Sequence, residues 1–125
     1  MVYWGVDQRL PKPVIWVGPA RRELKALPRE VQRTMGIALW FAQQGQVHPS
    51  ASPMKGSLSG VVEVREDFDR NTYRLMYLAK LGDVIYVLTA FPKKATKGIA
   101  TPKPILDRIA ARLRQAKAIH AGEGQ

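Results

Sequence analysis

The middle of the chain holds three short runs of β-branched, aromatic and aliphatic residues, separated by two turn sequences. The runs cover residues 61–66, 72–80 and 84–91, and the turns contain Asp69-Arg70-Asn71 and Gly82-Asp83. Turn residues of this kind join neighbouring antiparallel strands. The chain is therefore constrained to fold around a meander of three antiparallel strands. The last run is apolar on both faces, which predicts that it lies at the centre of the sheet.

The residues before the meander predict one more strand and two helices. Residues 14–17 form a β-branched and aromatic run, which is typical of a strand. Pro19 stands at the first position of a short helix, and Pro28 and Gly45 mark the start and end of a longer one. Trp40 widens the apolar stripe of the longer helix, so we expect it in the core.

The remaining segments complete one domain. Residues 46–60 are rich in Pro, Ser and Gly, which predicts a loop. A basic connector over 92–104 leads to a final amphipathic helix over 105–117. We expect an irregular lead-in over 1–12 and a frayed tail over 118–125. The whole chain is thus predicted as a single α+β domain, with two N-terminal helices packed on a mostly antiparallel four-stranded sheet and a C-terminal helix.

The charge balance indicates an anionic partner. Lys and Arg number 20 against 10 Asp and Glu, so the formal net charge is +10. Nucleic acid, anionic lipid and an acidic protein all fit such a charge, and nucleic acid is favoured. The chain has no cysteine, which fits a reducing compartment. No apolar run is long enough for a membrane span, and the charged lead-in is unlike a signal peptide, so we expect a cytoplasmic protein.

Most catalytic signatures are missing from the sequence. There is no glycine-rich phosphate loop, and neither His48 nor His120 has a second ligand at metal-binding spacing. The few carboxylates are scattered, so we expect no metal site and no cofactor. Cations, in contrast, recur along the predicted strands and their ends, at Lys55, Arg65, Arg74, Lys93, Lys94 and Lys97. A site for a polyanion, made of Lys, Arg and a tyrosine, is what remains.

Short motifs follow one another through this region in a fixed order. They are Lys55-Gly56, Glu63-Val64-Arg65, Tyr73-Arg74-x-x-Tyr77, Phe91-x-Lys93-Lys94 and Thr101-Pro102. This ordered set resembles the RelE/HigB superfamily of type II toxins, and most of all its phage-derived HigB-like branch. The sequence departs from the family pattern at Ala95, at the inserted residues 98–100 and at Ile105. These departures affect the region of Lys97 and the placement of the last helix.

The resemblance implies the small α+β fold expected above and an endoribonuclease that cleaves mRNA, often on the ribosome. It also implies a cognate antitoxin, for which we expect a small helix-turn-helix protein. RNA cleaves itself when its 2′-OH attacks the adjacent phosphate, so an enzyme need only position the strand, move protons and stabilise charge. Lys and Arg can do this without a metal ion.

Roles can be assigned to the individual cations on this basis. Arg65 and Arg74 are expected to bind the phosphate and stabilise the transition state. Of Lys93 and Lys94, one is expected to act as general acid or base and the other to hold the RNA backbone. Lys55, Tyr77 and Lys97 are expected to bind RNA.

A rival hypothesis belongs to another class of protein. The same charge and fold would suit a non-enzymatic basic domain that binds nucleic acid or a phage protein. Cations within strands favour a formed catalytic site, whereas cations confined to loops and helix surfaces would favour the binding domain.

Overall fold

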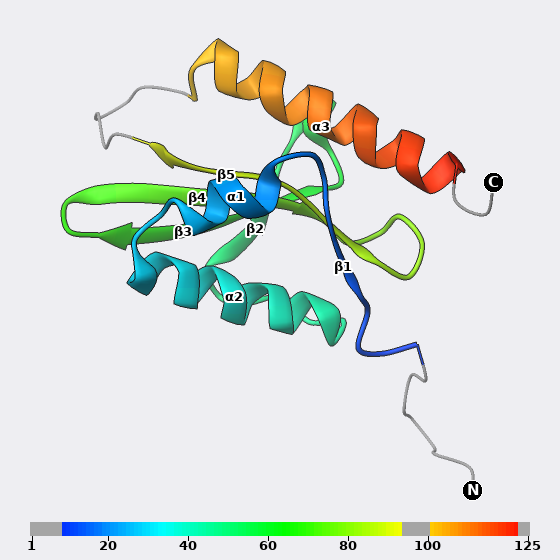
Figure 1. Ribbon diagram of the computed structural model, residues 1–125, viewed down its shortest axis with the longest axis horizontal. Coiled ribbons are helices and arrows are strands. Elements are labelled where there is room, and N and C mark those ends of the chain that lie inside the picture. Colours follow the sequence, from blue (N-terminus) through cyan, green and yellow to red (C-terminus); the bar gives the residue numbers. More distant parts are fainter. Residues whose placement is uncertain (1–8, 94–100, 123–125) are drawn as a thin grey trace, which may run out of the picture.

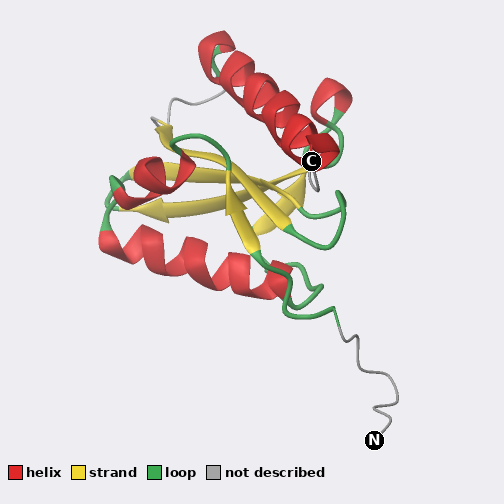
Figure 2. Ribbon diagram, turned by 45° about the vertical axis from the view of Figure 1, so that its right-hand side comes forward, coloured by secondary structure: helices red, strands yellow, loops and turns green. Residues whose placement is uncertain are grey.

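The computed structural model describes residues 9–93 and 101–122. A twisted five-stranded sheet lies between two helices, α2 (Arg29–Gln43) on one face and α3 (Lys103–Gly122) on the other (Figures 1 and 2). The short helix α1 (Ala20–Lys25) packs against β5 (Ile85–Lys93). Both N-terminal helices were expected to pack on the sheet, and they do.

The sheet contains the expected meander and one strand more than expected. The remaining strands are β1 (Val14–Trp16), β2 (Ala51–Pro53), β3 (Val61–Phe68) and β4 (Asn71–Leu78), and the order is β1-β5-β4-β3-β2. Only β1 pairs in parallel, with β5, and the other pairs are antiparallel. The central strand is therefore β4, which corrects the prediction that the last run of the meander is central. That run, β5, is still an inner strand, between β1 and β4.

The additional strand β2 comes from the segment that was predicted to be a loop. Its three residues, Ala51, Ser52 and Pro53, carry no apolar alternation, so no periodicity marks them as a strand. They pair with β3 at the edge of the sheet. An edge position suits Pro53, because proline lacks the N–H that an inner strand must donate.

The register of β3 and β4 is set by the tight turn between them. Phe68 pairs with Asn71, so the connection has two residues, Asp69 and Arg70. Both have positive φ, +50° and +66°, as the two central residues of a type I′ hairpin turn require. This turn type matches the twist of the two strands and places Arg65 directly opposite Arg74.

Each face of the sheet has its own apolar core. Val64, Tyr73, Leu75 and Tyr77 pack under the buried stripe of α2. On the other face Met76, Tyr86 and Leu88 pack against Ile109 and Leu113 of α3. Trp40 is 55% exposed, because it lies on the side of α2 away from the buried stripe. The prediction that Trp40 is a core residue is therefore wrong.

The helix α3 is longer than predicted and is held at two places. Near its C-terminal end His120 contacts the ring of Tyr86 in a T-shaped arrangement, with ring centroids 6.5 Å apart, so the helix continues through residues that were expected to fray. Near its middle Arg112 binds both carboxylate oxygens of Glu23 on α1, each at 2.9 Å. Arg112 also donates to the backbone oxygen of Leu88 at 2.8 Å.

The contact between Glu23 and Arg112 is a partly buried ion pair that joins α1 to α3. Thr89 Oγ1 donates a third hydrogen bond to Glu23, at 2.8 Å. Burial alone would raise the pKa of Glu23, but the hydrogen bonds from Arg112 and Thr89 and the charge of Arg112 lower it overall. The carboxylate is therefore stabilised in its charged form by the fold itself.

Candidate nucleic-acid interface

Three of the predicted site residues share one face of the sheet. Arg65 on β3 is paired with Arg74 on β4, and Thr72, two residues before Arg74, is paired with Lys93 on β5. Residues two apart on a strand point to the same side, and Met76, two residues after Arg74, packs in the core under α3. Arg65, Arg74 and Lys93 therefore lie on the α3 face. We call these three residues the basic cluster.

Arg74 is a mostly buried member of the basic cluster. Its guanidinium donates a hydrogen bond to the carboxylate of Glu63, and each of the two side chains is only 14% exposed. Its Nε is buried and has no acceptor among the residues that the structure describes. Arg74 is thus a fixed positive charge on this face. Its guanidinium is paired with Glu63, and its Nε–H group can still donate a hydrogen bond.

Arg65 is the solvent-facing member. Its side chain is 55% exposed, and its Nε lies 3.4 Å from Asp67, which is itself 67% exposed. Thr72 donates to the same carboxylate at 2.8 Å. This hydrogen bond is the main cause that lowers the pKa of Asp67; the charge of Arg65 adds to it, and burial opposes it. An exposed pair with this geometry is weak, so Arg65 can exchange Asp67 for a phosphate at little cost.

Lys93 lies where its ammonium form is disfavoured. Burial lowers its pKa below the ordinary value of 10.5, the charges of Arg74 and Arg65 lower it further, and Glu63 opposes this effect. Its Nζ is 3.5 Å from the hydroxyl of Thr101, close to the start of α3. A lysine with a lowered pKa releases and accepts a proton more readily near neutral pH, which is what acid–base catalysis requires.

The other predicted site residues do not join the basic cluster. Lys94 and Lys97 lie outside the described residues. Lys55 is exposed and directly precedes the short 3₁₀ helix Gly56–Leu58, which leads into β3. It therefore lies towards the Val61 end of the strand, away from the turn next to the basic cluster.

Tyr77 requires a correction. It was expected to bind RNA, but its side chain is only 1% exposed and belongs to the core under α2, on the opposite face from Arg74. Burial also raises the pKa of its phenol. A ring in this position cannot stack on a base at the basic cluster.

The acidic neighbours of the basic cluster were missed as functional residues by the sequence analysis. Glu63 pairs with Arg74, Asp67 pairs with Arg65, and Thr72 donates to Asp67. Strand alternation indicates that Glu63 and Arg65 share a face, but only the hairpin register shows that Arg74 reaches Glu63. Beside Arg65, an open hollow of about 480 Å³ is lined by Ser50, Ser52, Glu63, Asp67 and their neighbours.

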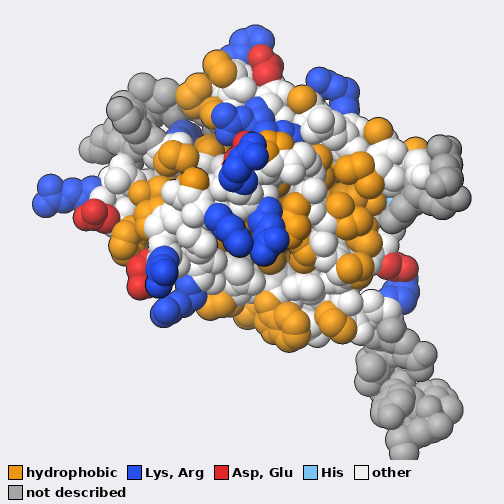
Figure 3. All heavy atoms as spheres, in the orientation of Figure 1, with side chains coloured by type: hydrophobic (Ala, Val, Ile, Leu, Met, Phe, Trp, Pro, Cys, Tyr) orange, Lys and Arg blue, Asp and Glu red, His pale blue; other side chains and the backbone are white. Residues whose placement is uncertain are grey.

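The surface agrees with the excess of positive charge. Figure 3 shows Lys and Arg side chains grouped near the middle of one side of the molecule, with few acidic side chains among them. Within residues 9–93 and 101–122, no three His, Cys, Asp or Glu side chains are placed to hold a metal ion. No helix in the same ranges is long and apolar enough to cross a membrane.

Comparison with known proteins identifies the family. A search of curated proteins found no match. Among solved structures, a chain of the toxin–antitoxin complex RelBE2 from Mycobacterium tuberculosis aligns with 67% of this chain and 100% of its own length, at 20% identity and a TM-score of 0.49. Residues 22–114 match the family described as phage derived protein Gp49-like. The chain belongs to this Gp49-like family, which confirms its expected place in the phage-derived branch of the RelE/HigB superfamily.

Proposed function

We propose that this chain is the toxin of a type II toxin–antitoxin system and that it cleaves mRNA on the ribosome without a metal ion. The observation that carries the proposal is the basic cluster, in which three cations from three neighbouring strands share one face of a rigid sheet. Membership of the Gp49-like family supports the toxin assignment. The net charge of +10 suits an RNA substrate.

The proposed reaction is transesterification within the RNA strand. The 2′-oxygen attacks the adjacent phosphorus while the bond from phosphorus to the 5′-oxygen breaks. A base takes the 2′-OH proton, and an acid gives a proton to the departing 5′-oxygen. The products are a 2′,3′-cyclic phosphate and a 5′-hydroxyl, and no oxidant, reductant or cofactor is consumed.

The members of the basic cluster suit different parts of this reaction. Arg65, which is exposed and weakly paired, binds the phosphate and stabilises the negative charge that develops on it in the transition state. Arg74, fixed by Glu63, adds a constant positive charge behind the phosphate. Lys93, with its lowered pKa, transfers one of the two protons.

The function is tested by replacing the exposed arginine. Arg65→Met keeps much of the aliphatic stem but removes the charge, and Lys25→Met removes another exposed charge, on α1, as a matched control. We expect Arg65→Met to slow RNA cleavage by about 10²–10³-fold, the effect of losing one donor to a developing oxyanion. Lys25→Met should arrest growth and cleave mRNA as the wild type does.

Product analysis completes the test. With free RNA as substrate, cleavage should persist in excess EDTA and should leave a 2′,3′-cyclic phosphate end. Loss of cleavage in EDTA that magnesium restores would contradict the metal-independent mechanism. Tight RNA binding by the wild type, with neither cleavage nor growth arrest, would instead favour the non-enzymatic binding domain.

A further inference from the structure

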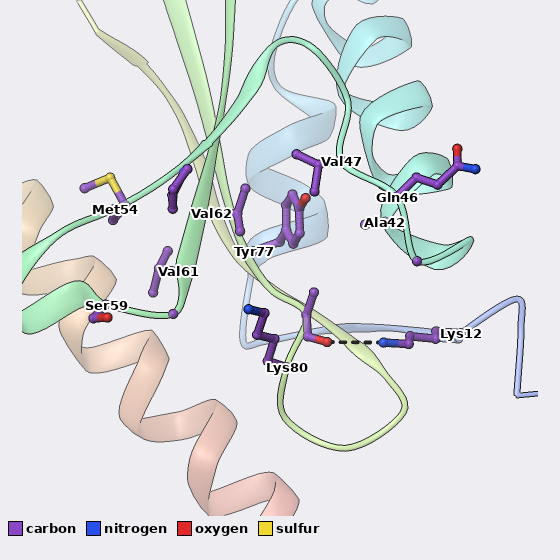
Figure 4. A pocket seen from close by; sticks show the side chains of 14 residues that line it. Lys12, Ala42, Gln46, Val47, Met54, Ser59, Val61, Val62, Tyr77 and Lys80 are labelled. Atoms are coloured by element: carbon purple, nitrogen blue, oxygen red, sulfur yellow. Dashed lines mark hydrogen bonds between the residues drawn. The ribbon is translucent and has the colours of Figure 1, made fainter. Parts of the chain in front are cut away.

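A cavity of about 510 Å³ lies at the end of the sheet away from the turn between β3 and β4 (Figure 4). Its inner wall is apolar and buried, with Ala42 at the end of α2, Val61 on β3 and Tyr77 on β4. Its mouth includes Val47, which is 65% exposed. A volume of this size is in the range of natural ligand pockets and holds one or two large apolar side chains.

The rim of the cavity is shaped by the end of α2. Gly45 has φ of +77° and donates to Ala42 O at 3.0 Å, and Gln46 donates to Phe41 O at 2.8 Å. These two bonds form a Schellman motif, which fixes the direction in which the chain leaves the helix. The wall that carries Val47 is therefore preformed.

The charge around the cavity has one sign. Lys12 and Lys80 line it, and none of its fourteen lining residues is Asp or Glu. Lys12 is held in place by a hydrogen bond to Ala79 O at 3.4 Å, drawn as a dashed line in Figure 4. An apolar interior under two lysines matches a ligand that is apolar at its centre and negatively charged around it.

We infer that this cavity is the anchor site for an acidic, amphipathic segment of the cognate antitoxin, an inference that rests on the proposed function. An apolar side chain of the segment fills the space above Tyr77, and its carboxylates meet Lys12 and Lys80. A second copy of this chain does not suit the site, because its own net charge is +10 and the rim is positive.

The position of the cavity has a consequence for inhibition. The pair formed by Val62 and Tyr77 is three residue pairs along the hairpin from Arg65 and Arg74, or about 10 Å. Tyr77 also points to the opposite face. An antitoxin anchored here leaves the basic cluster open unless a further part of it crosses the edge of the sheet.

The experiment uses the full chain and the protein encoded by the adjacent reading frame, which is the expected site of an antitoxin gene. Val47→Asp places a negative charge at the mouth of the cavity, and the matched control Ile119→Asp places one at an exposed apolar position on α3. Lys80→Glu reverses a charge at the rim, with Lys25→Glu on α1 as its control. Dissociation constants are measured by titration, and growth is followed with and without the partner.

The expected result is a complex weakened at least tenfold by Val47→Asp and by Lys80→Glu, and by less than about twofold by either control. Val47→Asp should arrest growth by itself as the wild type does, and should continue to do so when the partner is present. Unchanged affinity in both cavity variants, with a wild-type complex that forms normally, would overturn this inference and leave the toxin assignment intact. Failure of the wild-type chain to bind the partner at all would overturn the proposed function together with it.

Discussion

Replacing Arg74 should destabilise the fold far more than replacing Arg65, although the two arginines are directly paired. Arg74→Met removes the partner of Glu63 while that carboxylate stays only 14% exposed. Removing one member of a buried ion pair typically costs about 3–5 kcal/mol, because the other charge is left without compensation. The pair retains some solvent contact, so we expect the lower end of that range. This is a large share of the roughly 5–15 kcal/mol that stabilises a typical domain.

Arg65→Met provides the control for this prediction. Its ion pair with Asp67 is more than half exposed on both sides, and such pairs contribute at most about 1 kcal/mol. Urea unfolding of the two variants, followed by circular dichroism, should therefore show a difference of about 2–3 kcal/mol between them. The melting temperature of Arg74→Met should fall by about 10 °C.

A double variant tests the physical reason. If the loss in Arg74→Met comes from the uncompensated Glu63 carboxylate, then Glu63→Leu combined with Arg74→Met should recover most of it. The reasoning is refuted if Arg74→Met unfolds within about 1 kcal/mol of Arg65→Met, or if the double variant is less stable than the sum of the single ones.

Three further predictions concern pH and salt. The pKa of Lys93 is lowered in the folded chain, so the folded state loses this proton before the unfolded state does as pH rises. The stability of the wild type relative to Lys93→Met should therefore increase as pH approaches 10.5. A stability difference that stays constant with pH would contradict this prediction. The lowered pKa of Glu23 acts in acid. The wild type should be more stable than Glu23→Gln above pH 4.5, and this difference in the free energy of unfolding should disappear as pH falls through the lowered pKa. Acid titrations of both proteins measure it. The complex with the antitoxin should survive about 1 M salt, because screening weakens ion pairs but not an apolar anchor, and dissociation near 0.5 M in gel filtration would show that charge alone holds it.

The meander could be predicted from the sequence, and so could which residues of β3 share a face of the sheet. Turn residues at Asp69-Arg70-Asn71 and the alternation along β3 are local signals, and the structure follows both. The family resemblance depended on ordered motifs in the same region and is confirmed. The same alternation argues that Tyr77 and Arg74 do not belong to one site, because residues three apart on a strand point to opposite faces.

The features that the sequence analysis missed depend on contacts between distant segments. The strand β2 pairs only at the edge that β3 offers, and β4 is the single central strand because β1 adds beyond β5 and β2 adds beyond β3. The burial of Arg74 likewise follows from Glu63 on the neighbouring strand, not from any residue near Arg74 in the chain. Even Trp40, by itself a strong apolar signal, is exposed because it lies on the side of α2 away from the buried stripe that packs on the sheet.

The parallel pairing of β1 with β5 has a consequence for how the protein is made. Val14, near the start of the chain, pairs with Ile85, near its last third. During synthesis β1 therefore has no partner strand until the whole meander has left the ribosome, and closing so long a loop slows folding. Lys93 is in the same strand, β5, so the three cations of the basic cluster come together only after the chain has been made as far as the end of β5.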